Sequence, residues 1–174
     1  MHFGRVIIPV MLTALLAGCQ TSGSSSPVYQ TNAAFSPEEA SFINVQGTGR
    51  IKGSAYLETP NGRKPAARSK VTLVPATAYA RERVRLIYGN RKMASAKSVR
   101  FQGADRRYHA FTRSTMADIE GNFTFKGIGP GEYFVTTAVV WSPGGGEAER
   151  TSLINQVNLG AGEVAEVTLN AVWN

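Results

Sequence analysis

Residues 118–135 read DIEGNFTFKGIGPGEYFV, and this stretch decides how we expect the chain to fold. Two short segments within it alternate apolar and polar side chains, with Phe123 and Phe125 on one face of the first. The second segment begins near Tyr133, and the Gly-Pro-Gly sequence at 129–131 between them favours a reversal of the chain. The sequence therefore predicts two β-strands joined by a tight turn as a β-hairpin.

The same stretch carries oxygen-bearing side chains at a spacing that invites a calcium interpretation: Asp118, Glu120 and Asn122. An EF-hand loop also requires glycine at its sixth position and glutamate at its twelfth, and these positions hold Phe123 and Gly129. A phosphate loop is disfavoured because β-branched and aromatic residues, rather than a helix, follow the glycines. We therefore interpret the stretch as structural, with the Asp118 side chain capping its own turn.

Alternation elsewhere in the chain predicts further strands. They are expected at residues 47–57, 70–75, 98–102, 108–117, 153–159 and 164–172, beside those at 121–128 and 132–141. The strand at 132–141 is largely apolar on both faces, which predicts a central position in its sheet. About seven short strands separated by turn signals are typical of an all-β sandwich.

Between Thr77 and Gly89, the apolar residues follow the period of a helix instead of alternating as in a strand. Ala80, Val84 and Ile87 recur at helical spacing, Thr77 can cap the start and Gly89 can close the end. The predicted fold is therefore an all-β, seven-stranded sandwich with one short helical insertion.

Four blocks of sequence resemble the carboxypeptidase regulatory-like domain, a transthyretin-like (prealbumin-like) β-sandwich. They are GRIKGSA at 49–55, VTLVP at 71–75, the opening stretch at 118–135 and EVTL at 166–169. The resemblance covers roughly residues 47–172, and it implies a binding or scaffolding module without an activity of its own. The segment at about 76–107 exceeds the family pattern and is interpreted as an insertion.

The first twenty residues are organised as an export signal. Arg5 precedes an apolar run at residues 6–17, which is too short to cross a bilayer permanently. The end of the run resembles the bacterial lipobox, in which a signal peptidase cuts before a lipid-carrying cysteine: Leu16, Ala17, Gly18 and Cys19. The resemblance implies a signal peptide at 1–18 and a lipoprotein held in a membrane by acyl chains, palmitate among them, on Cys19. Gln20, in place of aspartate, implies the outer membrane facing the periplasm.

Residues 19–46 begin with a Ser, Gly, Thr and Pro cluster and show no sustained period. We expect them to form a flexible tether between the lipid and a folded domain at 47–174. Cys19 is the only cysteine, so no disulfide within the chain can support this domain, and its stability must come from a hydrophobic core.

Basic residues gather in the middle of the chain. Residues 63–113 hold fourteen of the 19 Lys and Arg side chains and two of the 12 acids, which gives this segment a net charge of +12. Such a block, interleaved with aromatic residues, predicts a polyanion partner. The candidate binding residues are Arg81, Arg83, Arg85, Arg91, Lys92, Lys97, Arg100, Arg106 and Arg107. The export signal argues against nucleic acid, so the expected partner is an anionic envelope polymer, a lipid head group or a protein; the alternative is a solvated face without a ligand.

Two other functions are open. A carbohydrate-binding accessory module would contact its ligand through exposed aromatic side chains, for which Tyr88, Trp141 and Trp173 are the candidates. An enzyme would have to use His109, because it is the only histidine after the signal peptide and no G-x-S-x-G motif is present. We predict a non-enzymatic envelope protein with no catalytic residues, no metal site and no cofactor.

Overall fold

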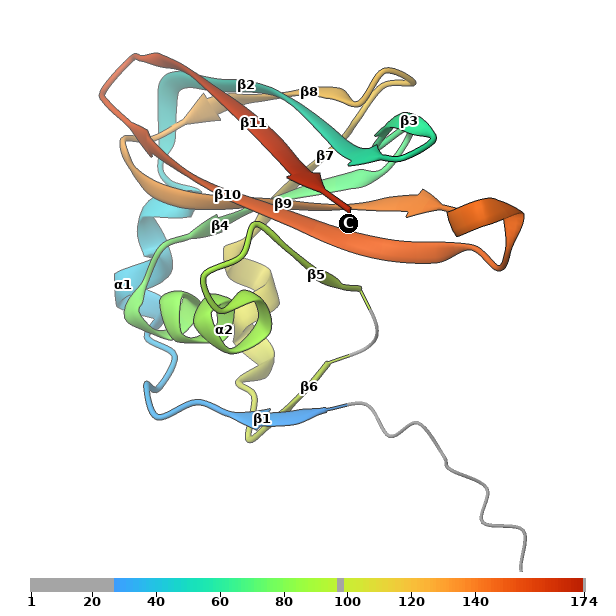
Figure 1. Cartoon of the computed structure of the whole chain (residues 1–174). Coiled ribbons are helices and arrows are strands. Elements are labelled where there is room, and N and C mark those ends of the chain that lie inside the picture. The colour runs from blue at the N-terminus through green and yellow to red at the C-terminus, as the bar shows by residue number, and fades with distance from the viewer. Residues whose placement is uncertain (1–26, 97–98, 174) are drawn as a thin grey trace, which may run out of the picture.

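A computed structural model describes residues 27–96 and 99–173. Two β-sheets pack face to face, and a layer of short helices covers the outer side of one of them (Figure 1). The five-stranded sheet has the order β5 (Met93–Ser95), β10 (Glu149–Leu159), β9 (Gly131–Trp141), β4 (Lys70–Pro75) and β7 (Arg113–Met116). In the second sheet β2 (Gln46–Thr59) pairs with β11 (Val164–Val172) along one edge and with β8 (Asn122–Ile128) and β3 (Gly62–Pro65) along the other. The predicted all-β sandwich is confirmed, with short β3 and β5 added to its main strands.

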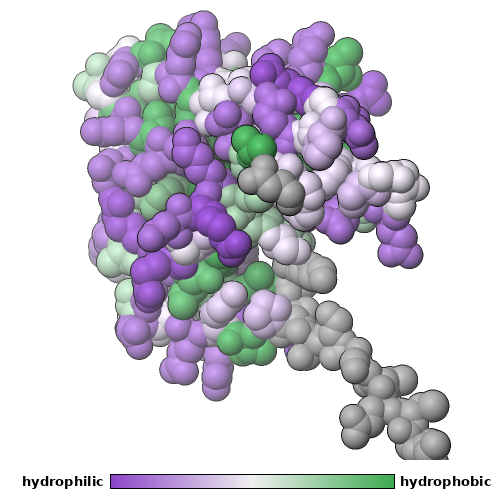
Figure 2. All heavy atoms as spheres, viewed as in Figure 1, coloured by the Kyte–Doolittle hydropathy of each residue, from purple (hydrophilic) through white to green (hydrophobic). Residues whose placement is uncertain are grey.

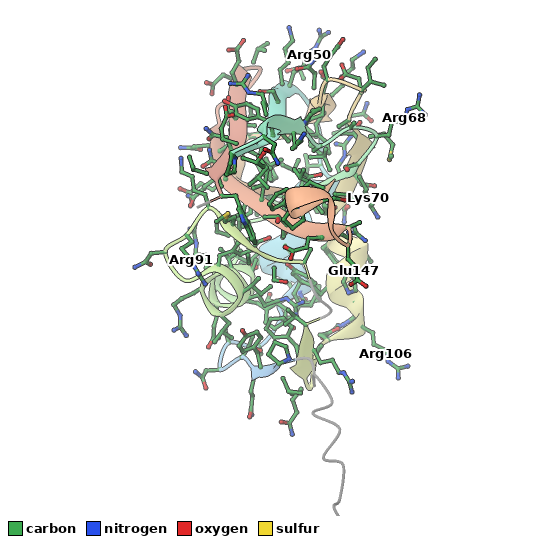
Figure 3. All side chains as sticks on the ribbon, turned by 45° about the vertical axis from the view of Figure 1, so that its right-hand side comes forward. Arg50, Arg68, Lys70, Arg91, Arg106 and Glu147 are labelled. Carbon is green, nitrogen blue, oxygen red and sulfur yellow. The ribbon has the colours of Figure 1, made fainter. Side chains whose placement is uncertain are left out.

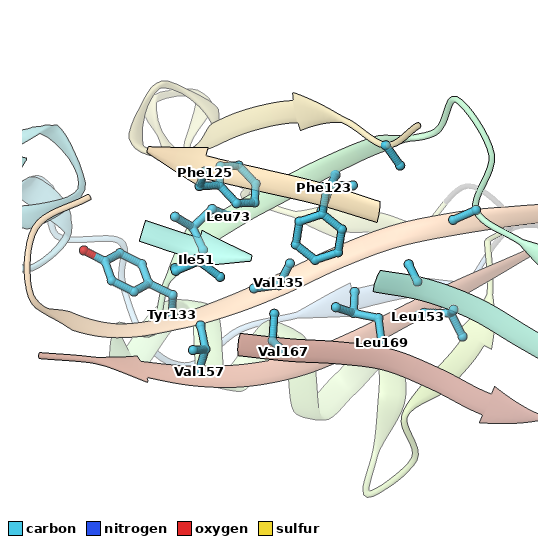
Figure 4. Packing of buried hydrophobic residues seen from close by; sticks show 14 of the residues in the cluster. Ile51, Leu73, Phe123, Phe125, Tyr133, Val135, Leu153, Val157, Val167 and Leu169 are labelled. Carbon is cyan, nitrogen blue, oxygen red and sulfur yellow. The ribbon is translucent and has the colours of Figure 1, made fainter. Parts of the chain in front are cut away.

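The core lies between the two sheets and contains the alternate apolar side chains predicted from the sequence (Figure 4). Tyr133, Val135 and Val139 of β9 are fully buried there. Strand β9 pairs with β10 on one side and β4 on the other, so its predicted central position is confirmed. Phe123 and Phe125 of β8 face it from the other sheet.

The predicted hairpin between β8 and β9 is wrong. Strand β8 pairs with β2, whereas β9 pairs with β10 and β4, so the turn at 129–131 carries the chain from one sheet to the other. Each strand has an apolar face, and placing them in opposite sheets lets both faces enter the same core. The turn is packed against Phe42, because a Cβ atom at Gly131 would lie 2.7 Å from that ring.

The structural interpretation of the turn before β8 is supported by its hydrogen bonds. Asp118 Oδ1 accepts from the backbone N–H groups of Glu120 at 2.9 Å and Asn122 at 2.8 Å. The Asn122 N–H bond contributes most to holding the pKa of the Asp118 carboxyl below its usual range. Gly121 adopts a φ of +86°, in the region that favours glycine.

The predicted helix is α2 (Ala78–Tyr88), and Thr77 caps it by accepting from the Ala80 N–H at 3.2 Å. It lies across the outer face of the five-stranded sheet and buries Val74, Phe134 and Ile154. The helical content is larger than predicted: α1 (Pro37–Ala40) and the 3₁₀ helices η1 (Ser41–Asn44), η2 (Arg106–Phe111) and η3 (Pro143–Gly145) are also present.

The strand predicted at 108–117 is wrong over its first part. Residues 106–111 form η2, and β7 begins at Arg113. Asp105 caps η2 by accepting from the backbone N–H of Arg107 at 2.8 Å. Tyr108 and Phe111, one 3₁₀ turn apart, both contact Phe35, at centroid distances of 5.8 and 5.5 Å.

The flexible tether predicted for 19–46 is wrong over residues 28–46. Strand β1 (Val28–Gln30) pairs in parallel with β6 (Arg100–Gln102), and α1 and η1 lead directly into β2. The predicted signal peptide, the lipobox residues and Cys19 lie outside the described residues. In the described part of the chain, no helix is long and apolar enough to span a bilayer.

Specific contacts hold this N-terminal segment to the helical layer. Phe35 is 8% exposed and packs against Tyr79, with ring centroids 5.7 Å apart. The carboxylate of Glu82 accepts hydrogen bonds from the backbone N–H groups of Asn32 and Ala33 at 2.9 and 2.8 Å. These bonds, with that of Ala33 contributing most, hold the pKa of Glu82 below its usual range. Sequence periodicity cannot detect such a segment, because its few apolar residues fill irregular sites.

The contacts of Phe35 predict that the segment contributes to stability. Phe35→Ala should lower the free energy of unfolding by about 3 kcal/mol, because it removes a buried ring from an aromatic cluster. Val28→Ala is the control, since Val28 is 61% exposed, and should change it by less than about 0.5 kcal/mol. Urea unfolding measures both; equal stabilities of the two variants would mean that the segment does behave as a tether.

Candidate ligand-binding site

Several of the predicted polyanion-binding residues are engaged with acidic side chains of the protein. Arg81 forms an ion pair with Glu132, Arg85 lies 3.8 Å from the Glu82 carboxylate, and Arg107 lies 2.8 Å from that of Asp105. The hydrogen bond from Arg107 is the largest cause of the lowered pKa of the Asp105 carboxyl. These pairs reduce the positive charge that the insertion offers to a ligand.

Arg83 has a structural role within the helical layer. Its guanidinium carbon lies 3.7 Å from the ring centroid of Phe101 and 4.7 Å from that of Tyr108. It also donates a hydrogen bond to the Tyr79 hydroxyl at 3.2 Å. Arg83 thus joins α2, β6 and η2 through cation–π contacts.

The other basic candidates are exposed but do not converge. Arg91 and Lys92 follow α2, Arg100 lies in β6 and Arg106 in η2. Figure 3 shows Arg91 and Arg106 extending from opposite sides of the helical layer. Figure 2 likewise shows hydrophilic side chains spread over much of one face rather than gathered over one element. Lys97 lies outside the described residues, so the described candidates form no single patch.

His109 is exposed in η2, and its ring centroid lies 5.5 Å from that of Tyr108. Within residues 27–96 and 99–173, no three His, Cys, Asp or Glu side chains are grouped so as to hold a metal ion.

Two of the three aromatic candidates for glycan contact are buried. Tyr88 is 5% exposed and Trp141 is 6% exposed, so their rings cannot serve as ligand platforms, and this part of the sequence prediction is wrong. Trp141 lies on the core face of β9, whereas Tyr88 packs between α2 and the outer face of the sheet. Trp173 is half-buried and borders the surface.

Trp173 is held firmly at the end of β11. Its backbone N–H donates to the Glu58 carbonyl at 2.9 Å, which continues the pairing of β11 with β2. Its ring packs edge-on against that of Trp141, with centroids 4.9 Å apart and planes at 69°. Trp141 is itself fixed, because its Nε1–H donates to Thr151 Oγ1 at 3.1 Å.

The indole of Trp173 combines an apolar ring with an N–H donor. A half-buried aromatic ring that is fixed by its neighbours and carries such a donor is a suitable platform for a polar ligand.

Trp173 lines two adjoining cavities, of about 350 and 680 Å³, at the edge of the five-stranded sheet. We call them together the β5-edge groove; both are lined by Ser95 of β5, Glu149 and Arg150 of β10, and Trp173. The larger volume is within the range of small-molecule sites. The groove combines an aromatic surface with a carboxylate, a guanidinium and a hydroxyl, which together can pack against a sugar ring and hydrogen-bond its hydroxyl groups.

Comparison with known proteins supports the sandwich fold. No protein family model and no curated protein matches the chain. Among solved structures it is similar to a "putative carbohydrate binding protein" from Pseudomonas aeruginosa, with a TM-score of 0.66 and 25% sequence identity; the match covers 80% of this chain and 99% of that chain. A 9R-lipoxygenase from Cyanothece has a TM-score of 0.29 and 12% identity over 82% of this chain and 18% of that chain, which is too low to carry an argument.

The contacts of Arg83 predict a stability effect that a solvated or ligand-binding arginine would not show. Arg83→Lys keeps the charge but loses the planar group, and should lower the free energy of unfolding by about 1–2 kcal/mol. Arg85→Lys is the matched control on the same helix and should leave it within about 0.5 kcal/mol. Chemical denaturation of both variants checks this, and an unchanged Arg83→Lys would contradict the structural role.

Proposed function

We propose that this protein is a non-enzymatic binding module of the cell envelope that takes saccharide chains in the β5-edge groove. The observation that carries the proposal is the fixed, half-exposed ring of Trp173 beside Arg150 and Glu149. Sugar rings have an apolar C–H face and a polar rim of hydroxyl groups. Trp173 offers a surface for the former, and the charged side chains offer hydrogen bonds for the latter.

The structural neighbour supports this proposal. It is a "putative carbohydrate binding protein", and the match extends over nearly the whole of that chain. The sequence resemblance to carboxypeptidase regulatory-like domains agrees with a module that binds rather than catalyses. The exposed His109 lies on η2, in the layer outside the five-stranded sheet, and none of the described residues that line the β5-edge groove is a histidine.

The location completes the proposal. The predicted lipidation of Cys19 would hold the module at the outer membrane, facing the periplasm, where polysaccharides of the envelope are accessible. The ordered segment at 28–46 would then join the lipid-bearing end directly to the helical layer through Phe35 and Glu82.

Trp173→Ala should weaken the binding of an envelope oligosaccharide by at least about tenfold, because it removes the aromatic surface and its N–H donor. Isothermal titration calorimetry with peptidoglycan-derived and lipopolysaccharide-derived oligosaccharides measures this. Val172→Ala is the control, since Val172 is the adjacent, 59% exposed side chain and is not among those lining the groove. Equal affinities for the two variants, or no saccharide binding by the unmodified protein, would refute the proposed function.

Cys19→Ala should abolish membrane association, because the acyl chains on this thiol are the proposed anchor. Fractionation of cells that express the full chain, with immunodetection, measures the distribution between membrane and soluble fractions. Gln20→Ala, which leaves the thiol in place, is the control and should remain with the membrane. Continued membrane fractionation of a processed Cys19→Ala protein would contradict the lipid anchor.

A further inference from the structure

The outer face of the five-stranded sheet has two different halves. Helix α2 covers the half that contains Val74, Phe134 and Ile154. Beyond this half, the outward-facing side chains are no longer both apolar and buried. They are Thr136, Ala138 and Val140 along β9, and Ser152 and Arg150 along β10. The helix therefore covers only part of this face.

A cavity of about 360 Å³ occupies the uncovered half, between the sheet, the end of α2 and the residues Ala96 and Val99. We call it the outer-face groove. The described residues that line it carry hydroxyl, basic and apolar side chains, come mainly from β4, α2, β5, β9 and β10, and include no acidic residue. Two cations, Lys70 from β4 and Arg150 from β10, lie on it.

These two cations differ from the paired arginines of the insertion. In the part of the chain that the structure describes, ion pairs form at Arg63, Arg81, Arg85 and Arg107, and none forms at Lys70 or Arg150. Two unneutralised cations facing one hollow attract an anion more strongly than isolated surface charges do. The groove is therefore suited to an anionic group.

The hydroxyl groups in the groove form a connected network of hydrogen bonds. Ser152 Oγ lies 3.3 Å from the Thr137 carbonyl oxygen, to which its hydroxyl can donate. The Tyr88 hydroxyl lies 2.6 Å from Ser152 Oγ, and either oxygen can be the donor in that pair. Thr136 Oγ1 lies 3.2 Å from the Tyr88 hydroxyl oxygen, and again either oxygen can donate.

The hydroxyl groups can also bind a ligand. Whichever oxygen of the Thr136–Tyr88 pair donates, Thr136 Oγ1 keeps at least one lone pair as an acceptor at the groove. This lone pair can receive a hydrogen bond from a ligand hydroxyl group. Acceptors beside two cations match a ligand that has both hydroxyl donors and a negative charge.

The outer-face groove adjoins the β5-edge groove. Ser95 and Arg150 line both, so a chain of sugar units bound at Trp173 can continue around the short strand β5 onto the outer face. The three residues of β5 are the only barrier that the described sheet places between them.

We propose that the outer-face groove is an anion subsite, which binds a carboxylate or phosphate group on an acidic saccharide whose neighbouring unit packs on Trp173. Lys70 and Arg150 contact the anion, and Thr136 Oγ1 accepts from a sugar hydroxyl. The inference rests on the proposed function and specifies its ligand as an acidic rather than a neutral saccharide.

The test uses calorimetric titration of the mature chain with three probes: an oligogalacturonate, a phosphorylated oligomannoside and a neutral chitooligosaccharide. At least one acidic probe should bind about tenfold more tightly than the neutral one, with a preference that falls as sodium chloride is raised. The two acidic probes show whether carboxylate or phosphate is the preferred anion.

Lys70→Met should remove most of the preference for the acidic probe and leave binding of the neutral probe unchanged. The reason is that Lys70 lines the outer-face groove and does not line the β5-edge groove. Lys92→Met is the matched control: it removes the same charge from an exposed site that lines neither groove, and should keep the preference. Thermal unfolding of both variants should match that of the unmodified chain, since both side chains are exposed.

The outcomes separate the two proposals. Equal binding of acidic and neutral probes, with Trp173 still required, overturns the anion subsite and leaves the proposed function standing. Equal losses in Lys70→Met and Lys92→Met also overturn it, because general attraction to the basic insertion would then explain the preference. Binding of no probe, or binding that does not depend on Trp173, overturns both.

Discussion

The structure depends on the burial of strand β9 on both of its faces. Its inner face supplies Tyr133, Val135 and Val139 to the core between the sheets, and Phe134 on its outer face needs a second cover. Helix α2 provides that cover, and its eleven residues end before the polar half of the outer face begins. The same strand thus requires the helical insertion and leaves a hydroxyl-lined hollow beside it.

The basic insertion has a structural explanation that its composition does not suggest. Arg83 lies against three aromatic rings, and Arg81, Arg85 and Arg107 lie beside carboxylates. Exposed ion pairs contribute little individually, about 0–1 kcal/mol, whereas a stacked guanidinium orders the elements around it. Lys70 and Arg150, the cations that line the outer-face groove, come from strands β4 and β10.

The sequence predicted the strands and the helix well, because alternation and helical spacing are local. The prediction failed where the structure depends on contacts between segments that are distant in the sequence. Strands β8 and β9 have the local pattern of a hairpin, but packing around the shared core places them in different sheets. Residues 28–46 are held by single contacts such as Phe35 and Glu82, which have no period to detect. Among the aromatic candidates, Trp141 falls on the same face of β9 as Tyr133, so its burial could be predicted from the alternation of side chains. The burial of Tyr88 could not be predicted in this way, because it depends on where α2 packs on the sheet. The outer-face groove could not be predicted, because its lining residues come from separate strands.

The central claim is that ligand binds at the edge of the five-stranded sheet, around Trp173 and β5, and not at the basic helical layer. Titration of the ¹⁵N-labelled mature protein with the saccharide probe, followed by amide chemical shifts, tests it directly. The account predicts saturable shifts at residues 94–96, 149–152 and 172–173, together with the indole N–H of Trp173. Shifts confined to α2 and η2, around Arg81 and Arg106, would contradict it.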